Sequence, residues 1–102
     1  MNAMPPIRIW ILRRGSGRAE ATPSPVHLKP AETFRIRNLT QEEATVVFPE
    51  GTIGLDMRSI PPKGVATGTV IVAGPDFFEY DVSLREGNYV DGGSKPGVIV
   101  DG

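Results

Sequence analysis

Cysteine is absent from this chain of 102 residues, and histidine occurs once, as His27. The absence of cysteine excludes disulfide bonds, thiolate metal sites, iron–sulfur clusters and cysteine nucleophiles. A single histidine leaves little room for a histidine-rich metal site or a Ser-His-Asp triad. Because no nucleophile–base pair or cofactor fingerprint is visible elsewhere, we expect neither an enzyme nor a bound cofactor.

Long apolar runs are also lacking. No stretch approaches the ~20 apolar residues of a membrane span, so we expect no membrane partner. The apolar run at residues 7–12 is interrupted by Arg8 and followed, rather than preceded, by basic residues, which is unlike a signal peptide. The compartment stays open between the cytoplasm and, if a leader has been removed, the periplasm. The length favours one domain over residues 1–102.

Charge of one sign is not in excess, because the formal net charge is -1. Residues 1–37 nevertheless carry +5 and residues 38–102 carry -6. Either the two halves interleave on folding, or Arg8, Arg13, Arg14 and Arg18 form a basic patch. We expect no nucleic-acid partner, since no aromatic residue interleaves with these arginines. Arg13, Arg14 and Arg18 stay candidates for binding another partner.

The residues that are plentiful favour β-structure. Val, Ile and Thr number 25 against 5 Leu, and no window has a helical apolar stripe. Ten prolines and twelve glycines divide the chain into short runs, which is typical of an all-β sandwich or barrel. We predict seven or eight strands, which include Ile7–Arg13, Val26–Leu28, Thr33–Asn38, Thr45–Phe48, Val65–Val72, Phe77–Leu84 and Val98–Val100.

The segments between these strands are predicted to be loops. Residues 15–25 are rich in turn formers and predict a mobile loop. Pro49–Ser59 predicts an irregular connection with at most one short turn of helix, and Arg85–Lys95 a glycine-rich loop. Within the strands, alternation places Phe34 and Ile36 inward.

Several segments resemble a known family when taken in order. Residues 26–38 contain a Lys-Pro-Ala-Glu-Thr turn before a strand that ends in Asn, and residues 45–48 supply a following strand. A proline-glycine turn at 60–64, an aromatic strand at 77–81 and a last strand at 97–100 follow. These segments resemble the strands of cupredoxins of the plastocyanin type. The resemblance implies a Greek-key β-sandwich.

The copper ligands of cupredoxins have no counterpart here. By the resemblance, the first histidine falls at Ala44 and the cysteine at or near Val82. The second histidine and the methionine fall in Arg85–Lys95, which contains neither. Type 1 copper needs two histidines and a cysteine, usually with a weak axial methionine. We therefore assign no metal ligands and expect Val82 and Leu84 to fill this end with apolar side chains.

Trp10 and the pair Phe77-Phe78 are candidate anchors for a partner. Adjacent strand residues face opposite sides, so Phe77 and Phe78 cannot both enter one core. We expect the outer ring to be tucked under a loop, with an exposed anchor as the alternative. Asn38-Leu39-Thr40 has the pattern of a glycosylation sequon, which has meaning only in a secreted eukaryotic protein.

The acidic residues Asp76, Glu79, Asp81 and Glu86 could bind a hard cation such as calcium. Because no calcium-loop pattern is present, we favour charge pairs across strands, for example with the arginines of the strand at 33–38. His27 is expected on the polar face of its strand.

Together these patterns indicate a copper-free, cupredoxin-like module that binds or assembles and does not catalyse. Its recognition chemistry is expected in Pro49–Ser59, in Arg85–Lys95 or on an exposed edge strand. The expected partner is a protein or a second copy of the chain, and small molecules are left open. The alternative is a metal-handling protein that uses oxygen ligands, Met57, His27 or the N-terminal amine.

Overall fold

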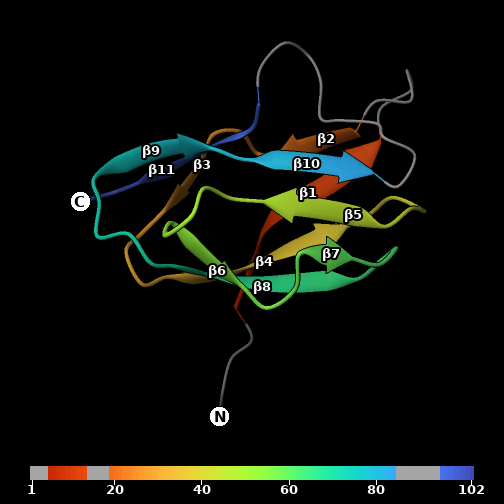
Figure 1. Cartoon of the computed structure of the whole chain (residues 1–102), viewed down its shortest axis with the longest axis horizontal. Coiled ribbons are helices and arrows are strands. Elements are labelled where there is room, and N and C mark those ends of the chain that lie inside the picture. The colour runs from red at the N-terminus through yellow and green to blue at the C-terminus, as the bar shows by residue number, and fades with distance from the viewer. Residues whose placement is uncertain (1–4, 14–18, 85–94) are drawn as a thin grey trace.

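The computed structural model describes residues 5–13, 19–84 and 95–102, and within them every regular element is a β-strand (Figure 1). The strands are β1 (Ile7–Arg13), β2 (Ala19–Thr22), β3 (Val26–Leu28), β4 (Thr33–Asn38), β5 (Ala44–Val47), β6 (Ile53–Leu55), β7 (Ser59–Ile60), β8 (Val65–Val70), β9 (Asp76–Glu79), β10 (Asp81–Leu84) and β11 (Gly97–Val100). The prediction of an all-β fold is confirmed.

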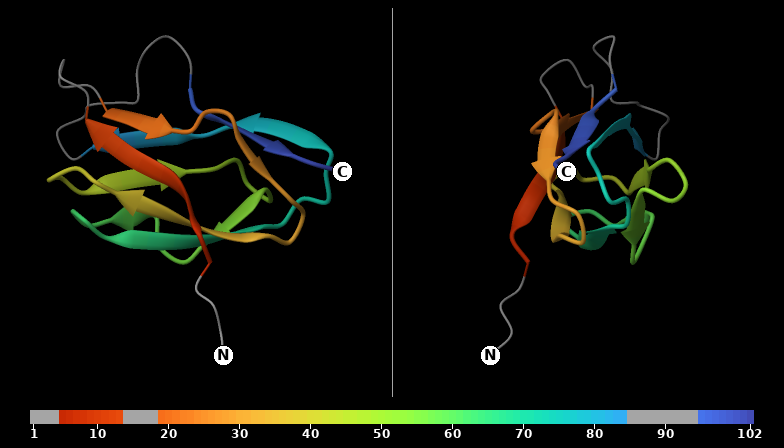
Figure 2. Two further views of the ribbon diagram at one scale, coloured as in Figure 1. Left: turned by 180° about the vertical axis from the view of Figure 1, so that it is seen from behind. Right: turned by 90° about the vertical axis from the view of Figure 1, so that its left-hand side faces the viewer.

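The strands pair into three hydrogen-bonded sheets. Their orders are β2-β1-β4-β8-β6, β10-β5-β7 and β3-β11-β9. Two pairings, β1 with β4 and β3 with β11, are parallel, and the others are antiparallel. Strands β5 and β10 lie in front of β1 and β2, and the two layers are also visible edge-on (Figures 1 and 2). The molecule is a β-sandwich whose core lies between these layers.

Alternation along the strands supplies the core. Ile9 and Ile11 of β1 are buried, as are Phe34 and Ile36 of β4, while Trp10 between the two isoleucines is exposed. The buried side chains form one apolar cluster, to which both layers contribute. The inward orientation predicted for Phe34 and Ile36 is therefore confirmed.

Three strands were not predicted. Residues 19–22, which the sequence analysis placed in a mobile loop, form β2, so the loop prediction is wrong there. Ala19 and Ala21 are buried small side chains that let β2 pack close to the layer containing β10. Strands β6 and β7 lie in and beside the connection predicted to be irregular, and no helical turn is present in it. The aromatic strand is divided at Tyr80 into β9 and β10.

Both predicted proline turns are present. The Glu32 N–H donates to the Lys29 carbonyl, and the Gly64 N–H donates to the Pro61 carbonyl. The third residue of each turn, Ala31 or Lys63, has a positive φ near 64° or 63°. Proline at the second position and a positive φ at the third are the features of a type II turn. These turns fix where β4 and β8 begin.

One end of the sandwich is closed by Asn38, which is fully buried at the end of β4. Its Nδ2 donates to the carbonyls of Glu42 at 2.7 Å and Ile60 at 3.0 Å. Its Oδ1 accepts from the Thr40 N–H at 2.9 Å and the Thr40 hydroxyl at 2.7 Å. This network joins β4, the turn before β5, and β7, and we call it the closed end. Because the Asn38 amide is buried and bonded, the folded chain does not present the sequon for glycosylation.

Candidate functional site

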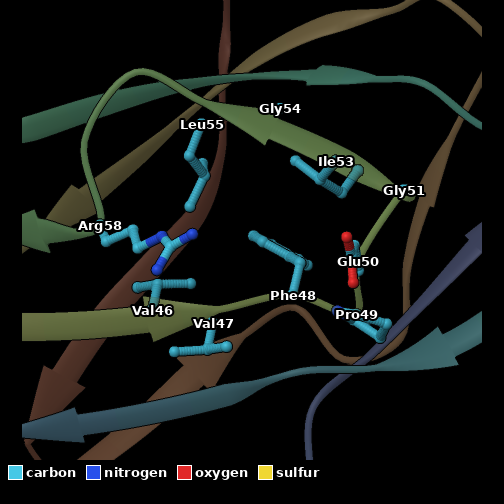
Figure 3. Close-up of a pocket in the computed structure, with 10 residues that line it drawn as sticks. All are labelled: Val46, Val47, Phe48, Pro49, Glu50, Gly51, Ile53, Gly54, Leu55 and Arg58. Carbon is cyan, nitrogen blue, oxygen red and sulfur yellow. The ribbon is translucent and has the colours of Figure 1, made fainter.

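The opposite end of β5 opens onto a groove of about 560 Å³. Strand β5 leads into the connection at 48–52, which turns back into the edge strand β6 (Figure 3). The lining residues come from β5, this connection, β6 and the segment before β7, and they are Val46, Val47, Phe48, Pro49, Glu50, Gly51, Ile53, Gly54, Leu55 and Arg58. This cavity is called the groove below.

Phe48 lies between the walls of the groove and is anchored in the core (Figure 3). Its ring stacks on Tyr80 with centroids 4.6 Å apart and meets Phe78 edge-on at 6.4 Å. The Tyr80 hydroxyl is buried and has no hydrogen-bond partner among the described residues, and burial raises the pKa of this group well above its ordinary value. The groove therefore has a packed aromatic floor rather than a mobile one.

The two walls of the groove differ in their backbone pairing. On one side, the β5–β7 pairing extends to the Val46 N–H, which donates to the Arg58 carbonyl at 2.9 Å. On the other side, β8 is the one strand among those described that pairs with β6. Thr52 and Asp56, which flank β6, both bond to the β8 side. Because alternate residues of a strand point their backbone groups in opposite directions, Ile53 and Leu55 direct theirs away from β8.

The two charged residues of the groove lie at opposite ends. Arg58 directs its guanidinium between Leu55 and Val46, and Glu50 stands near Gly51 (Figure 3). Neither makes an ion pair with any residue that the structure describes. A groove with several apolar side chains, exposed polar surface and a cation at one end can hold a ligand that combines apolar groups with a negative charge.

Trp10 lies outside the groove, on the outer face of β1, and its side chain is 36% exposed. It lines a separate shallow depression of about 440 Å³ together with Pro23, Pro25 and His27. Its cross-strand neighbours are Thr22 and Arg37. Trp10 is thus accessible to a partner, as an anchor must be.

Phe77 is 59% exposed on the edge strand β9, so the expectation of a ring tucked under a loop is wrong. Phe78 takes the buried position instead. The Phe77 ring lies across Gly97 of β11, where a Cβ atom would approach it to 2.9 Å. Phe77, Ile99 and His27 form one cross-strand row, and His27 also lines the depression beside Trp10. The structure therefore places both predicted aromatic anchors along one outer surface.

The arginines of the proposed basic patch are paired where the structure describes them. Arg8 contacts Glu32 at 3.1 Å, and Arg13 forms an ion pair with Glu42. Arg14 and Arg18 lie outside the described residues. Glu32 belongs to the same basic half of the chain as Arg8, whereas Glu42 comes from the acidic half, so the Arg13–Glu42 pair is the contact that favours interleaved charge over a basic patch.

The acidic residues do not form the expected pairs or a metal cluster. Asp81 contacts Lys95 at 3.1 Å, and neither β9 nor β10 belongs to the sheet that holds the β4 arginines, so that pairing prediction is wrong. His27 is exposed, and its Nδ1 lies 3.9 Å from Asp101 Oδ1. Across the described ranges no three His, Asp or Glu side chains gather as a metal site would require, while Glu86 lies outside those ranges. The metal-handling hypothesis stays a prediction.

The sequence indicated the groove only as a connection. Pro49–Ser59 was expected to carry recognition chemistry, but Phe48 and Arg58 were not singled out. The available signal was an uncharged Ile-Gly-Leu run followed by Asp56, Met57 and then Arg58. This run lines a groove only because β6 pairs with β8 at the end of a sheet, and that pairing joins segments that are separated in sequence.

No protein-family model matches this sequence, and no curated protein matches it. In the segments that the structure describes, no helix is long and apolar enough to span a membrane.

Proposed function

We propose that this chain is a binding module without catalytic activity, and that the groove is its recognition site. The observation that carries the proposal is the Arg58 guanidinium, which has no ion partner among the described residues and points into the groove beside Leu55 and Val46 (Figure 3). A groove of this size that combines apolar side chains with a few charged and backbone polar groups is compatible with a ligand site. Glu50 is a carboxylate in the described lining that could act as a general base, but that lining holds no Ser, Cys, Lys or His for it to activate.

We further propose that the fold is a copper-free relative of the cupredoxins with Greek-key connections. The order of its motifs supports the resemblance. By the resemblance, the first histidine would lie at Ala44 and the cysteine at or near Val82, and both residues are buried and apolar, as is Leu84, which pairs with Ala44 near the closed end. Recognition then lies away from that end, at the groove.

The test uses two matched charge reversals. Arg58→Glu changes the groove, whereas Arg37→Glu makes the same change on exposed β4, where Arg37 has no ion partner in the described part of the chain. Wild type and both variants are immobilised, exposed to lysate of the source cells, and compared by quantitative mass spectrometry. We expect a protein retained by wild type and Arg37→Glu but lost from Arg58→Glu.

Self-association is measured on the same three proteins by sedimentation. Identical captured proteins and identical oligomeric states for all three would overturn the proposal, because the groove would then make no difference to binding.

A further inference from the structure

We propose that the occupant of the groove is an extended peptide segment of a partner protein. It would add as a strand to β6 and place an acidic side chain on Arg58. This inference rests on the proposed function and names the kind of partner that the groove takes.

The first observation is the unpaired edge of β6. Ile53 and Leu55 each direct an N–H and a C=O away from β8, on the edge of β6 that borders the groove, which offers a bound strand up to about four backbone hydrogen bonds. Peptides commonly bind by adding a strand to such an edge, because main-chain hydrogen bonds then supply affinity.

The second observation is that β6 lacks the protection found on the other edge strands. Charged or titratable residues commonly guard sheet edges against pairing. Among the described edge strands, β2 carries Glu20, β3 carries His27, β9 carries Asp76 and Glu79, and β10 carries Asp81. Strand β7 is only two residues long. Strand β6, Ile-Gly-Leu, is also short, but among the described edge strands of three or more residues it is the one without a charged or titratable side chain.

The third observation is the chemistry around that edge. Alternate side chains of an added strand would face the apolar side chains of Phe48, Ile53 and Leu55, which favours apolar residues at those positions of the peptide. Arg58 lies at the Leu55 end of the groove (Figure 3). Arginine pairs with carboxylates through two parallel hydrogen bonds, so an acidic residue of the peptide would contact it. The group proposed to contact Arg58 is an acidic side chain within the peptide rather than its terminal carboxylate.

The experiment begins with a random peptide library displayed on phage and selected against the whole chain. We expect selected peptides to alternate apolar residues and to share an acidic residue. Synthetic copies, blocked at both termini, should lose about tenfold or more in affinity for Arg58→Glu and little for Arg37→Glu. Replacing the shared acid by lysine should recover binding to Arg58→Glu.

Backbone pairing is then tested directly. In a scan of single N-methylated amides, we expect alternate positions to abolish binding and the intervening ones to be tolerated, because only every second N–H of an added strand faces β6. In the protein, Leu55→Pro removes the N–H that residue 55 directs away from β8. It should weaken binding far more than Leu55→Val, which keeps this N–H.

The outcomes separate this inference from the proposed function. Peptides that need Arg58 but show no alternating pattern would overturn strand addition and leave the groove as the binding site. Peptides that bind all variants equally would overturn both. Failure to select any peptide would overturn the strand inference, while the capture and sedimentation comparison decides the proposed function. Binding that requires a free C-terminal carboxylate, or occupation of the groove by a second copy of the chain, would also overturn it.

Discussion

Strand β5 begins at the closed end of the molecule and leads at its other end into the groove. The two ends differ in whether their polar groups have hydrogen-bond partners. At the closed end, the Asn38 side chain donates to carbonyls of two other segments and accepts from Thr40, all within the interior. At the groove, the backbone groups of Ile53 and Leu55 and the guanidinium of Arg58 have no partner among the described residues. Buried, satisfied polar groups hold the fold together, whereas accessible, unsatisfied ones are available to a ligand.

The largest effect is expected from Asn38→Ala, which removes the side chain that bonds the closed end together. The change removes the donor to the Ile60 carbonyl and the acceptor of the Thr40 N–H, and it leaves the Glu42 carbonyl with the Thr40 hydroxyl at 3.0 Å as its remaining side-chain donor. We expect the free energy of unfolding to fall by about 3 kcal/mol, since each buried polar group left unpaired costs roughly 1–3 kcal/mol. Chemical denaturation measures the loss. Thr40→Val, which removes one hydroxyl, should cost about 1 kcal/mol, and equal losses for the two variants would contradict the central role of Asn38.

A second prediction concerns the core behind the groove wall. A Cβ atom at Gly68 of β8 would lie 2.7 Å from Phe34 Cζ and 3.2 Å from Ile53 Cγ2. We expect Gly68→Ala to lower the free energy of unfolding by about 2 kcal/mol, because overpacking a filled core forces its neighbours to move. The exposed neighbour variant Thr69→Ala should stay within about 0.5 kcal/mol of wild type. A Gly68→Ala protein as stable as Thr69→Ala would mean that β6 is not held by the core.

The third prediction concerns the hydroxyl buried beneath the groove floor. Tyr80→Phe removes a buried hydroxyl that has no hydrogen-bond partner in the described part of the chain, and it keeps the ring stacked on Phe48. We expect stability to rise by about 1 kcal/mol, since that desolvation penalty disappears. Denaturation at neutral pH measures it, and a loss of stability would show that the hydroxyl has a partner.

The same variant has a pH signature with a definite sign. Burial raises the pKa of Tyr80 above its ordinary value of 10.0, so the folded chain keeps a proton that the unfolded chain loses. Wild-type stability contributed by this group is therefore complete below pH 10 and falls as pH rises beyond it, by up to about 1.4 kcal/mol per pH unit. Tyr80→Phe should fall less steeply above pH 10, and parallel curves would contradict the burial of the hydroxyl.

The smallest change in stability is expected at the groove, where the prediction is that Arg58 does not help to hold the fold together. Arg58→Glu changes an exposed side chain that has no ion pair in the described part of the chain. Its free energy of unfolding should stay within about 0.5 kcal/mol of wild type. A larger loss, in thermal or chemical denaturation, would assign Arg58 a structural role and remove it as a recognition group.

Local pattern was enough to predict the strands in which apolar and polar residues alternate. The bounds of β1, β3 and β4 match the predicted ones, because Ile, Val and Phe mark one face of each strand. Strand β2 was missed because its buried residues are alanines, which carry little β-preference and become strand through pairing with β1. Strand β6 was missed because a three-residue strand containing glycine is defined by its register with β8.

The candidate site depends on the same long-range pairings. The sequence indicated that residues 49–59 carry recognition, but it could not bring Phe48 and Arg58 together. Arg58 reaches the groove because the β5–β7 pairing stops beside it, and Phe48 is held there by Tyr80 across the core. Neither contact is between neighbours in sequence. The exposure of Phe77 likewise follows from β9 being at a sheet edge.

The position of Trp10 has a practical consequence for work on this protein. It is the one tryptophan of the chain, and β4 and β8 separate its strand from β6 in the sheet order. Its fluorescence therefore serves as an internal reporter of unfolding that a ligand in the groove does not touch. Folding and groove occupancy can be followed in one sample as two independent signals.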